Sequence, residues 1–175
     1  MSFDPQSLWP ILAREPAPRR YLLAFSGGLD SHVLLHALCA LRDRFPETAI
    51  HALHVHHGLS PRADAWAAHC KTIAEALGVP CEVFKVHAHP LTGQSPEAAA
   101  RAARYQAFAR VMRPGDYLLT AHHQDDQAET LLLQLLRGSG PHGLAAMPAR
   151  ASFAAGLLLR PLLGFSRAEL HDYAL

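Results

Sequence analysis

Cysteine is scarce in this sequence of 175 residues, and the few cysteines form no metal-binding pattern. Cys39, Cys70 and Cys81 lie far apart in the chain, and no Cys-x-x-Cys pair is present. An odd number of cysteines without that spacing argues against a disulfide framework and against a zinc ribbon. All three lie among apolar residues, so we expect buried and unreactive thiols.

Long apolar runs and a large net charge are lacking too. No apolar stretch approaches the ~20 residues that span a bilayer, and the N-terminus lacks the basic start and apolar centre of a signal peptide. We therefore expect a cytoplasmic protein with no membrane partner. The formal net charge is only +1, so composition does not indicate the basic surface of a strong nucleic-acid binder.

What the sequence does contain is a regular alternation of short apolar runs and helical patterns. Half of the residues are hydrophobic and 18% are charged, which is typical of one globular domain. We expect strands at residues 21–25, 49–54, 81–86 and 117–120, with a weaker one at 156–160. Helices are expected at residues 29–44, 62–77, 96–112 and 124–137. This order predicts an α/β fold of three layers, a mostly parallel sheet with helices on both faces.

The most informative motif follows the first expected strand and reads Ser26-Gly27-Gly28-Leu29-Asp30-Ser31. A strand, a glycine turn and a helix start aim backbone N–H groups at one point, which suits a phosphate chain. The serine hydroxyls add donors, and Asp30 could hold a metal ion that bridges phosphates. No Gly-Lys-Ser/Thr follows, so this is not a Walker A loop. The alternative is a turn that uses glycine only for tight packing.

Two polar clusters follow other expected strands. Residues 54–60 include His54, His56 and His57, and residues 121–130 include His122, His123, Asp125, Asp126 and Glu129. Ligands of open parallel sheets bind outside the carboxyl ends of the strands, so both clusters should converge on the glycine turn. Taken singly, each histidine could be a surface group, and the paired aspartates could be favourable charges at a helix start. The spacing fits neither an H-E-x-x-H nor a cysteine-containing zinc site.

The helix expected from Pro96 carries a charged stripe. Glu97, Arg101, Arg104 and Phe108 share one face, with Tyr105 beside them. An exposed Glu97–Arg101 ion pair would leave Arg104 unexplained, whereas two arginines beside a nucleotide could neutralise its phosphates or a developing charge. An adjacent apolar stripe is expected to pack on the sheet; it consists of Ala98, Ala102, Ala109 and Met112. The next helix is expected to pack inward through Leu132, Leu133 and Leu136.

These motifs together resemble a known family. The glycine turn matches the SGGxDS loop of the PP-loop ATP pyrophosphatases. HVHHGLSPRADAWAAHC at 54–70, EAAARAARYQAF at 97–108, TAHHQDDQAETLLLQLLRGSGPHGL at 120–144 and LLRPLL at 158–163 extend the match to the tRNA(Ile)-lysidine synthetase family. His56 departs from it, since many members have Asn there. Residues 1–175 would be the N-terminal catalytic domain, incomplete at its C-terminus and without the family's C-terminal tRNA-binding domains.

The resemblance implies a two-step ligase that uses ATP and Mg²⁺. ATP would adenylate the wobble cytidine of a tRNA(Ile) with a CAU anticodon and release pyrophosphate, and L-lysine would then displace AMP to form lysidine. The implied phosphate cradle is Ser26, Gly27, Gly28, Leu29, Asp30 and Ser31, with His54 and His57 at the nucleotide and Asp30 on Mg²⁺. The implied catalytic residues are Asp30, Arg101, Arg104, His123, Asp125, Asp126 and Glu129. Asp125 or Asp126 would bind the ammonium group of lysine. A homodimer is left open.

Three other functions remain open at this point. A PP-loop tRNA thiolase generally needs cysteines at its site or an iron–sulfur cluster held by Cys-x-x-Cys pairs, and no such pair is present. A metal-dependent phosphohydrolase rests only on the histidine and aspartate clusters. A non-catalytic nucleotide-binding module would need the glycine turn but not the stripe of residues 97–105.

Overall fold

A six-stranded sheet forms the centre of the protein in the computed structural model, which describes residues 2–58, 61–86, 93, 95–138 and 146–175. The strand order is β3-β2-β1-β4-β6-β5, and all neighbours are parallel except β5 and β6. The strands are β1 (Arg20–Ala24), β2 (Ala49–His56), β3 (Cys81–Lys85), β4 (Asp116–Leu119), β5 (Arg150–Phe153) and β6 (Gly156–Leu159). The predicted mostly parallel sheet is confirmed, and β5 is an additional strand that the sequence analysis missed.

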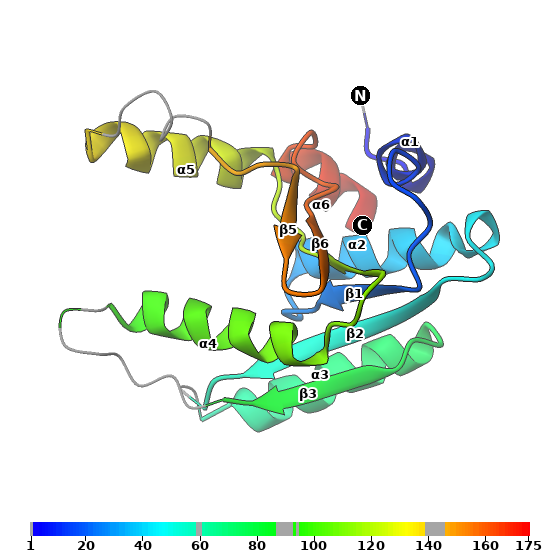
Figure 1. Cartoon of the computed structure of the whole chain (residues 1–175), viewed down its shortest axis with the longest axis horizontal. Coiled ribbons are helices and arrows are strands. Elements are labelled where there is room, and N and C mark those ends of the chain that lie inside the picture. Colours follow the sequence, from blue (N-terminus) through cyan, green and yellow to red (C-terminus); the bar gives the residue numbers. More distant parts are fainter. Residues whose placement is uncertain (1, 59–60, 87–92, 94, 139–145) are drawn as a thin grey trace.

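Helices cover both faces of this sheet, as predicted (Figure 1). The described helical elements are η1 (Pro5–Leu8), α1 (Trp9–Leu12), α2 (Leu29–Ala40), η2 (Arg42–Arg44), α3 (Ala63–Ala76), α4 (Pro96–Val111), α5 (Gln124–Leu136) and α6 (Arg167–Ala174). Leu23 of β1 belongs to a buried cluster with residues of α1, α2, α3 and α6. Its neighbour Leu22 faces the other way and packs with Phe108 of α4. Among the described residues, no helix is both long and apolar enough to cross a membrane.

The chain reverses direction across the sheet at β1. From β1 it proceeds to β2 and β3 on one side, and it then returns to place β4 on the other side of β1. In open α/β sheets such a reversal leaves a crevice at the carboxyl ends of the two strands that flank it. The glycine turn follows β1, and the segment containing His122 and His123 follows β4. The topology therefore brings these two motifs to the same crevice.

The sheet-facing side of α4 differs from the predicted one. Met112 is buried as predicted, but it is joined by Ala99, Ala107 and Phe108, whereas Ala98 and Ala102 are exposed. Burial of a phenylalanine removes far more apolar area from water than burial of an alanine, so Phe108 determines how the helix is turned. Because Arg104 lies one turn before Phe108, this rotation also carries Arg104 toward the sheet.

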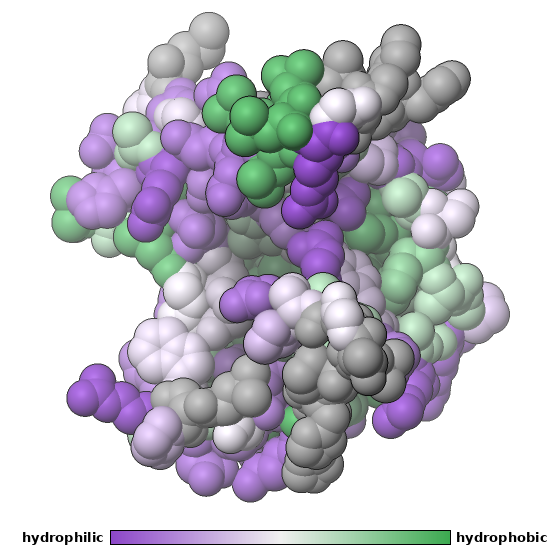
Figure 2. Space-filling model, turned by 90° about the vertical axis from the view of Figure 1, so that its left-hand side faces the viewer, coloured by the Kyte–Doolittle hydropathy of each residue, from purple (hydrophilic) through white to green (hydrophobic). Residues whose placement is uncertain are grey.

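The prediction that α5 packs inward was wrong. None of its residues is buried, and Leu132 and Leu136 are 59% and 84% exposed. The helix extends beyond the sheet from the end of β4, so its second half projects away from the sheet (Figure 1). Seen end-on, the surface is hollowed between α5 and α4, and apolar side chains gather on the outer part of α5 (Figure 2).

Candidate nucleotide-binding site

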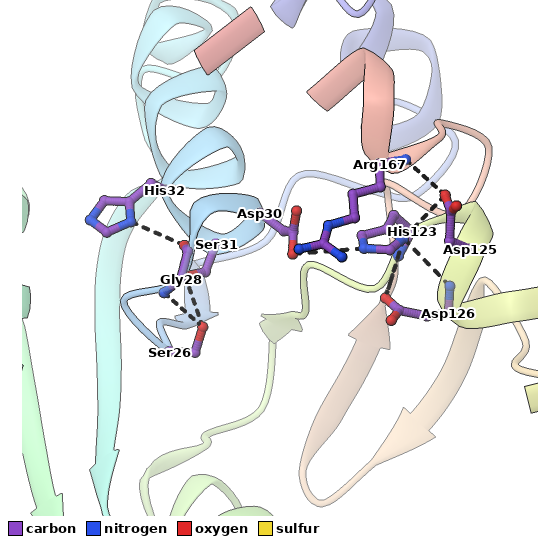
Figure 3. A network of polar contacts seen from close by, with 9 residues as sticks. All are labelled: Ser26, Gly28, Asp30, Ser31, His32, His123, Asp125, Asp126 and Arg167. Carbon is purple, nitrogen blue, oxygen red and sulfur yellow. Dashed lines mark hydrogen bonds and ion pairs between the residues drawn. The ribbon is translucent and has the colours of Figure 1, made fainter. Parts of the chain in front are cut away.

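The glycine turn forms a compact loop at the start of α2. Ser26 Oγ accepts a hydrogen bond from the Gly28 N–H (3.2 Å) and lies 3.1 Å from Ser31 Oγ, which donates to the Gly28 carbonyl (2.8 Å) (Figure 3). Gly28 is the N-cap of α2, and no side chain caps that helix. The first amide groups of α2, at Leu29 and Asp30, therefore stay available for an anion at the helix N-terminus.

Gly27 is the tightest point of this loop. Its φ is +82°, in the left-handed region that favours glycine. A Cβ atom placed there would lie 2.6 Å from Cys70 Sγ and 2.8 Å from Trp66 Nε1, both on α3. Glycine is therefore required here for its backbone conformation and for the close approach of α3.

Replacing Gly27 by Ala should lower the free energy of unfolding by roughly 3 kcal/mol. The backbone strain of an alanine at positive φ and the steric clash of its Cβ with α3 both contribute to this loss. Gly138→Ala is the matched control: Gly138 has φ +68°, and no described residue lies within 4 Å of a Cβ built there, so only about 1 kcal/mol of backbone strain is expected. Urea denaturation of both variants measures the difference. Equal losses would show that α3 does not constrain the loop.

A cavity of about 540 Å³ opens beside the loop, between β1, β2, α3 and α4. Apolar side chains form most of its wall, including Phe25, Leu53, Val55 and Phe108. Its polar lining includes Ser26, His54, His57 and Arg104. An apolar cavity of this volume with a few polar groups is typical of a small-ligand site, and a nucleoside is of suitable size.

Three of the polar side chains of this cavity differ in how they are paired: His54 has a hydrogen-bond partner, whereas His57 and Arg104 each have a buried nitrogen without one among the described residues. His54 Nδ1 lies 2.9 Å from the Phe25 carbonyl, to which it must donate, and burial lowers the pKa of His54. His57 Nδ1 and Arg104 Nε are buried atoms that have no hydrogen-bond partner within the described part of the chain. Burial lowers the pKa of both groups. Unpaired buried polar atoms are costly, so these two favour a polar ligand in the cavity.

A smaller cavity of about 140 Å³ joins the loop to the end of β4. Asp30, Arg104, Thr120 and His122 are among its lining residues. Burial, followed by the charge of Arg160, lowers the pKa of His122 to about 4, and its Nδ1 lies 2.8 Å from Thr120 Oγ1. His122 is therefore a neutral imidazole at neutral pH, with arginine as the principal cation of this cavity.

Carboxylates and one buried histidine meet where α5 begins. His123 and Asp126 form a capping box, in which the His123 N–H donates to Asp126 Oδ2 (2.9 Å). His123 Nε2 also lies 3.7 Å from Asp30 Oδ2 of α2, which is too long for a hydrogen bond but places the two side chains next to each other. His123 thus links the acidic start of α5 to the phosphate loop (Figure 3).

Asp125 and Asp126 point in different directions. Asp125 Oδ2 accepts the backbone N–H of Arg167, the first residue of α6, at 2.8 Å. Asp126 lies on the other side of the His123 ring (Figure 3). The Arg167 side chain reaches toward Asp30 and His123 in the same view. Arg167 is a residue that the sequence analysis missed, because only the contact between α5 and α6 brings it here.

Of the remaining candidate residues, Arg101 and Glu129 lie farther out, whereas His56 lines the larger cavity. Arg101 is exposed, with its Cζ 5.1 Å from the centre of the Tyr105 ring, and Glu129 is exposed on the second turn of α5. His56 is buried, and its Nε2 lies 3.3 Å from Asp64, whose pKa is lowered chiefly by Lys85. The roles assigned to all of these residues stay predictions.

The described residues contain no cluster of three or more His, Cys, Asp or Glu that could hold a metal ion by themselves. A Mg²⁺ that arrives with ATP needs only one or two carboxylates, since phosphates and water supply its other ligands. Asp30 fits this requirement, because its Oδ1 is buried without a hydrogen-bond partner among the described residues.

Comparison with known proteins identifies the family. The family model described as a PP-loop domain matches residues 6–175. The chain belongs to the PP-loop family. Curated relatives named tRNA(Ile)-lysidine synthase are 53% identical over 154 residues in Methylococcus capsulatus and 54% identical over 156 residues in Salmonella paratyphi B. The predicted resemblance is thus confirmed. The two matches cover 88% and 89% of this PP-loop chain. They cover only 35% and 36% of the length of the respective relatives.

Solved structures share the fold of this PP-loop domain. The U34-tRNA thiolase NcsA from Methanococcus maripaludis has a TM-score of 0.78 at 19% identity, over 97% of this chain and 60% of its own. The NH3-dependent NAD synthetase from Campylobacter jejuni has a TM-score of 0.56 at 12% identity, over 99% of this chain and 73% of its own. At such identities the likeness shows a common fold and does not decide between their reactions.

Proposed function

We propose that this PP-loop domain carries out the ATP-dependent chemistry of a tRNA(Ile)-lysidine synthetase. The observation that carries this proposal is the uncapped N-terminus of α2 at the sheet's reversal point, next to a cavity of nucleoside size. The relatives at 53–54% identity supply the reaction class. The chain spans little more than a third of their length, so tRNA(Ile), L-lysine and ATP as substrates are all part of the proposal.

In this proposal the nucleoside of ATP occupies the larger cavity and the phosphates lie over residues 26–31. Ser26 and Arg104 line both cavities, so they are placed at the junction between nucleoside and phosphates. The helix N-terminus and the Arg104 charge would stabilise the negative charge that develops as the bond between the α and β phosphates breaks. Asp30 would bind the Mg²⁺ that accompanies the phosphates, which neutralises part of their charge.

Lysine would approach from the start of α5. Its ammonium loses water on entering the crevice and then needs a carboxylate partner. Each of the two aspartates has one oxygen that accepts a backbone N–H, but the Asp125 carboxylate is turned toward α6, whereas that of Asp126 lies on the other side of the His123 ring (Figure 3). We assign the ammonium contact to Asp126, with Glu129 on the following turn as a second carboxylate.

The cysteines do not favour the thiolase alternative. Burial raises the pKa of Cys70 and of Cys81 to about 11, and it raises that of Cys39 as well. A thiol with a raised pKa is a poor nucleophile, because the thiolate is the reactive form. Sulfur delivery by any of the three would therefore work against the local environment.

The test combines the protein with ATP, Mg²⁺, radiolabelled lysine and a CAU-anticodon tRNA(Ile). We expect label in the tRNA, with AMP and pyrophosphate released, and pyrophosphate release with tRNA even when lysine is omitted. Phosphate or nucleotide hydrolysis that needs neither tRNA nor lysine would indicate a phosphohydrolase instead. ATP binding without any product would indicate a binding module.

A further inference from the structure

One residue outside the predicted site contacts the backbone of the phosphate loop. Trp66, in the first turn of α3, donates its indole Nε1–H to the carbonyl of Ser26 at 2.8 Å. The two residues are 40 positions apart, so this contact exists only because α3 packs against the loop. Trp66 also forms part of the wall of the larger cavity.

This hydrogen bond determines the orientation of one peptide plane. In a trans peptide the carbonyl of Ser26 and the N–H of Gly27 point in opposite directions. No peptide bond in the described chain is cis. A carbonyl that is held toward Trp66 therefore turns the Gly27 N–H away from α3, toward the side on which phosphates would bind.

The glycines of the loop would let this peptide plane rotate if nothing held it. Gly27 and Gly28 follow it directly, and glycine rotates its backbone more freely than any other residue. A flip of the plane would aim the Ser26 carbonyl oxygen at the phosphates, where it would repel them, and would withdraw one N–H donor. Trp66 is 47% exposed, so its ring contributes only part of its area to the core.

We propose that Trp66 is a positioning residue, which keeps the Ser26–Gly27 peptide in the orientation that donates to the phosphates of ATP. The proposal rests on the ATP site proposed above. It assigns Trp66 to phosphate binding and not to recognition of the nucleoside, although its ring borders the nucleoside cavity. Loss of the indole N–H should therefore affect only ligands that carry phosphates.

The test is Trp66→Phe, which keeps an aromatic ring and removes the donor, with calorimetric titration of ATP, inorganic tripolyphosphate and adenosine. We expect about tenfold weaker binding of ATP and tripolyphosphate, the value of one hydrogen bond to a charged site, and unchanged adenosine binding. Trp9→Phe is the matched control, since Trp9 lies in α1 beside Arg44, away from the loop, and should change nothing.

The outcomes separate this proposal from the nucleotide site itself. Unchanged ATP binding by Trp66→Phe, or equal weakening of adenosine and tripolyphosphate, would overturn the positioning role. A parent protein that binds neither ATP nor tripolyphosphate would overturn the nucleotide site, and the role of Trp66 with it. If the variant fails to fold, hydrogen exchange of the Trp66 indole N–H in the parent decides: slow exchange from a half-exposed ring supports the bond, and fast exchange contradicts it.

Discussion

Asp30→Ala should reduce ATP-dependent pyrophosphate release by at least about a hundredfold, the usual cost of losing a group that organises transition-state charge. Asp30 lies in the first turn of α2, and its buried Oδ1 has no hydrogen-bond partner among the described residues. The carboxylate therefore contributes little to the fold but is placed to bind Mg²⁺ beside the phosphates. The measurement is pyrophosphate release with tRNA and Mg²⁺ at saturating ATP.

The matched control for this variant is Asp43→Ala, which removes an exposed carboxylate from η2, away from the loop. It should leave pyrophosphate release unchanged, and thermal unfolding should confirm that both variants are folded. Full activity of Asp30→Ala would remove Asp30 from the site, and the metal would then need another ligand.

The second large effect is expected at the start of α5. Asp126→Asn should raise the KM for lysine about 10- to 100-fold, the value of one hydrogen bond between charged partners, while pyrophosphate release without lysine persists. Asparagine keeps an oxygen that can accept the His123 N–H, so the capping box survives and only the charge is lost. The measurement is lysine incorporation as a function of lysine concentration.

Asp125→Asn provides the comparison, because it makes the same chemical change one residue away. Its oxygen can still accept the Arg167 N–H, and its carboxylate faces α6, so the KM for lysine should change little. A raised KM in Asp125→Asn alone would exchange the two roles. An unchanged KM in both variants would show that lysine is bound elsewhere.

Much of the fold could be predicted because its signals are local. Five of the strands and the helices between them follow from apolar runs, turns and periodicity, and the parallel sheet follows from their alternation. Strand β5 could not be predicted from local sequence. Its residues alternate between exposed and half-buried, and it is ordered by antiparallel pairing with β6 and by contacts with distant residues, such as that of Phe153 with Tyr105.

The candidate site likewise has parts that local sequence predicts and parts that depend on tertiary contacts. The loop at residues 26–31 is contiguous, so its glycines, serines and Asp30 could be proposed as a phosphate cradle from their order along the chain. The face of α4 that meets the sheet could not be predicted from its alanines, since Phe108 determines the rotation. The exposed leucines of α5 were misjudged because an apolar stripe predicts burial only where another element covers it.

The sequence by itself therefore determined the fold class, the phosphate loop and the family. The tertiary structure decided which side chains reach the crevice. It turns the Asp125 carboxylate toward α6 and that of Asp126 to the other side of the His123 ring, and it brings Trp66 to the carbonyl of Ser26. These outcomes depend on how α3, α5 and α6 pack against segments distant in the chain. Spacing along a helix specifies which residues share a face, but only packing specifies what that face meets.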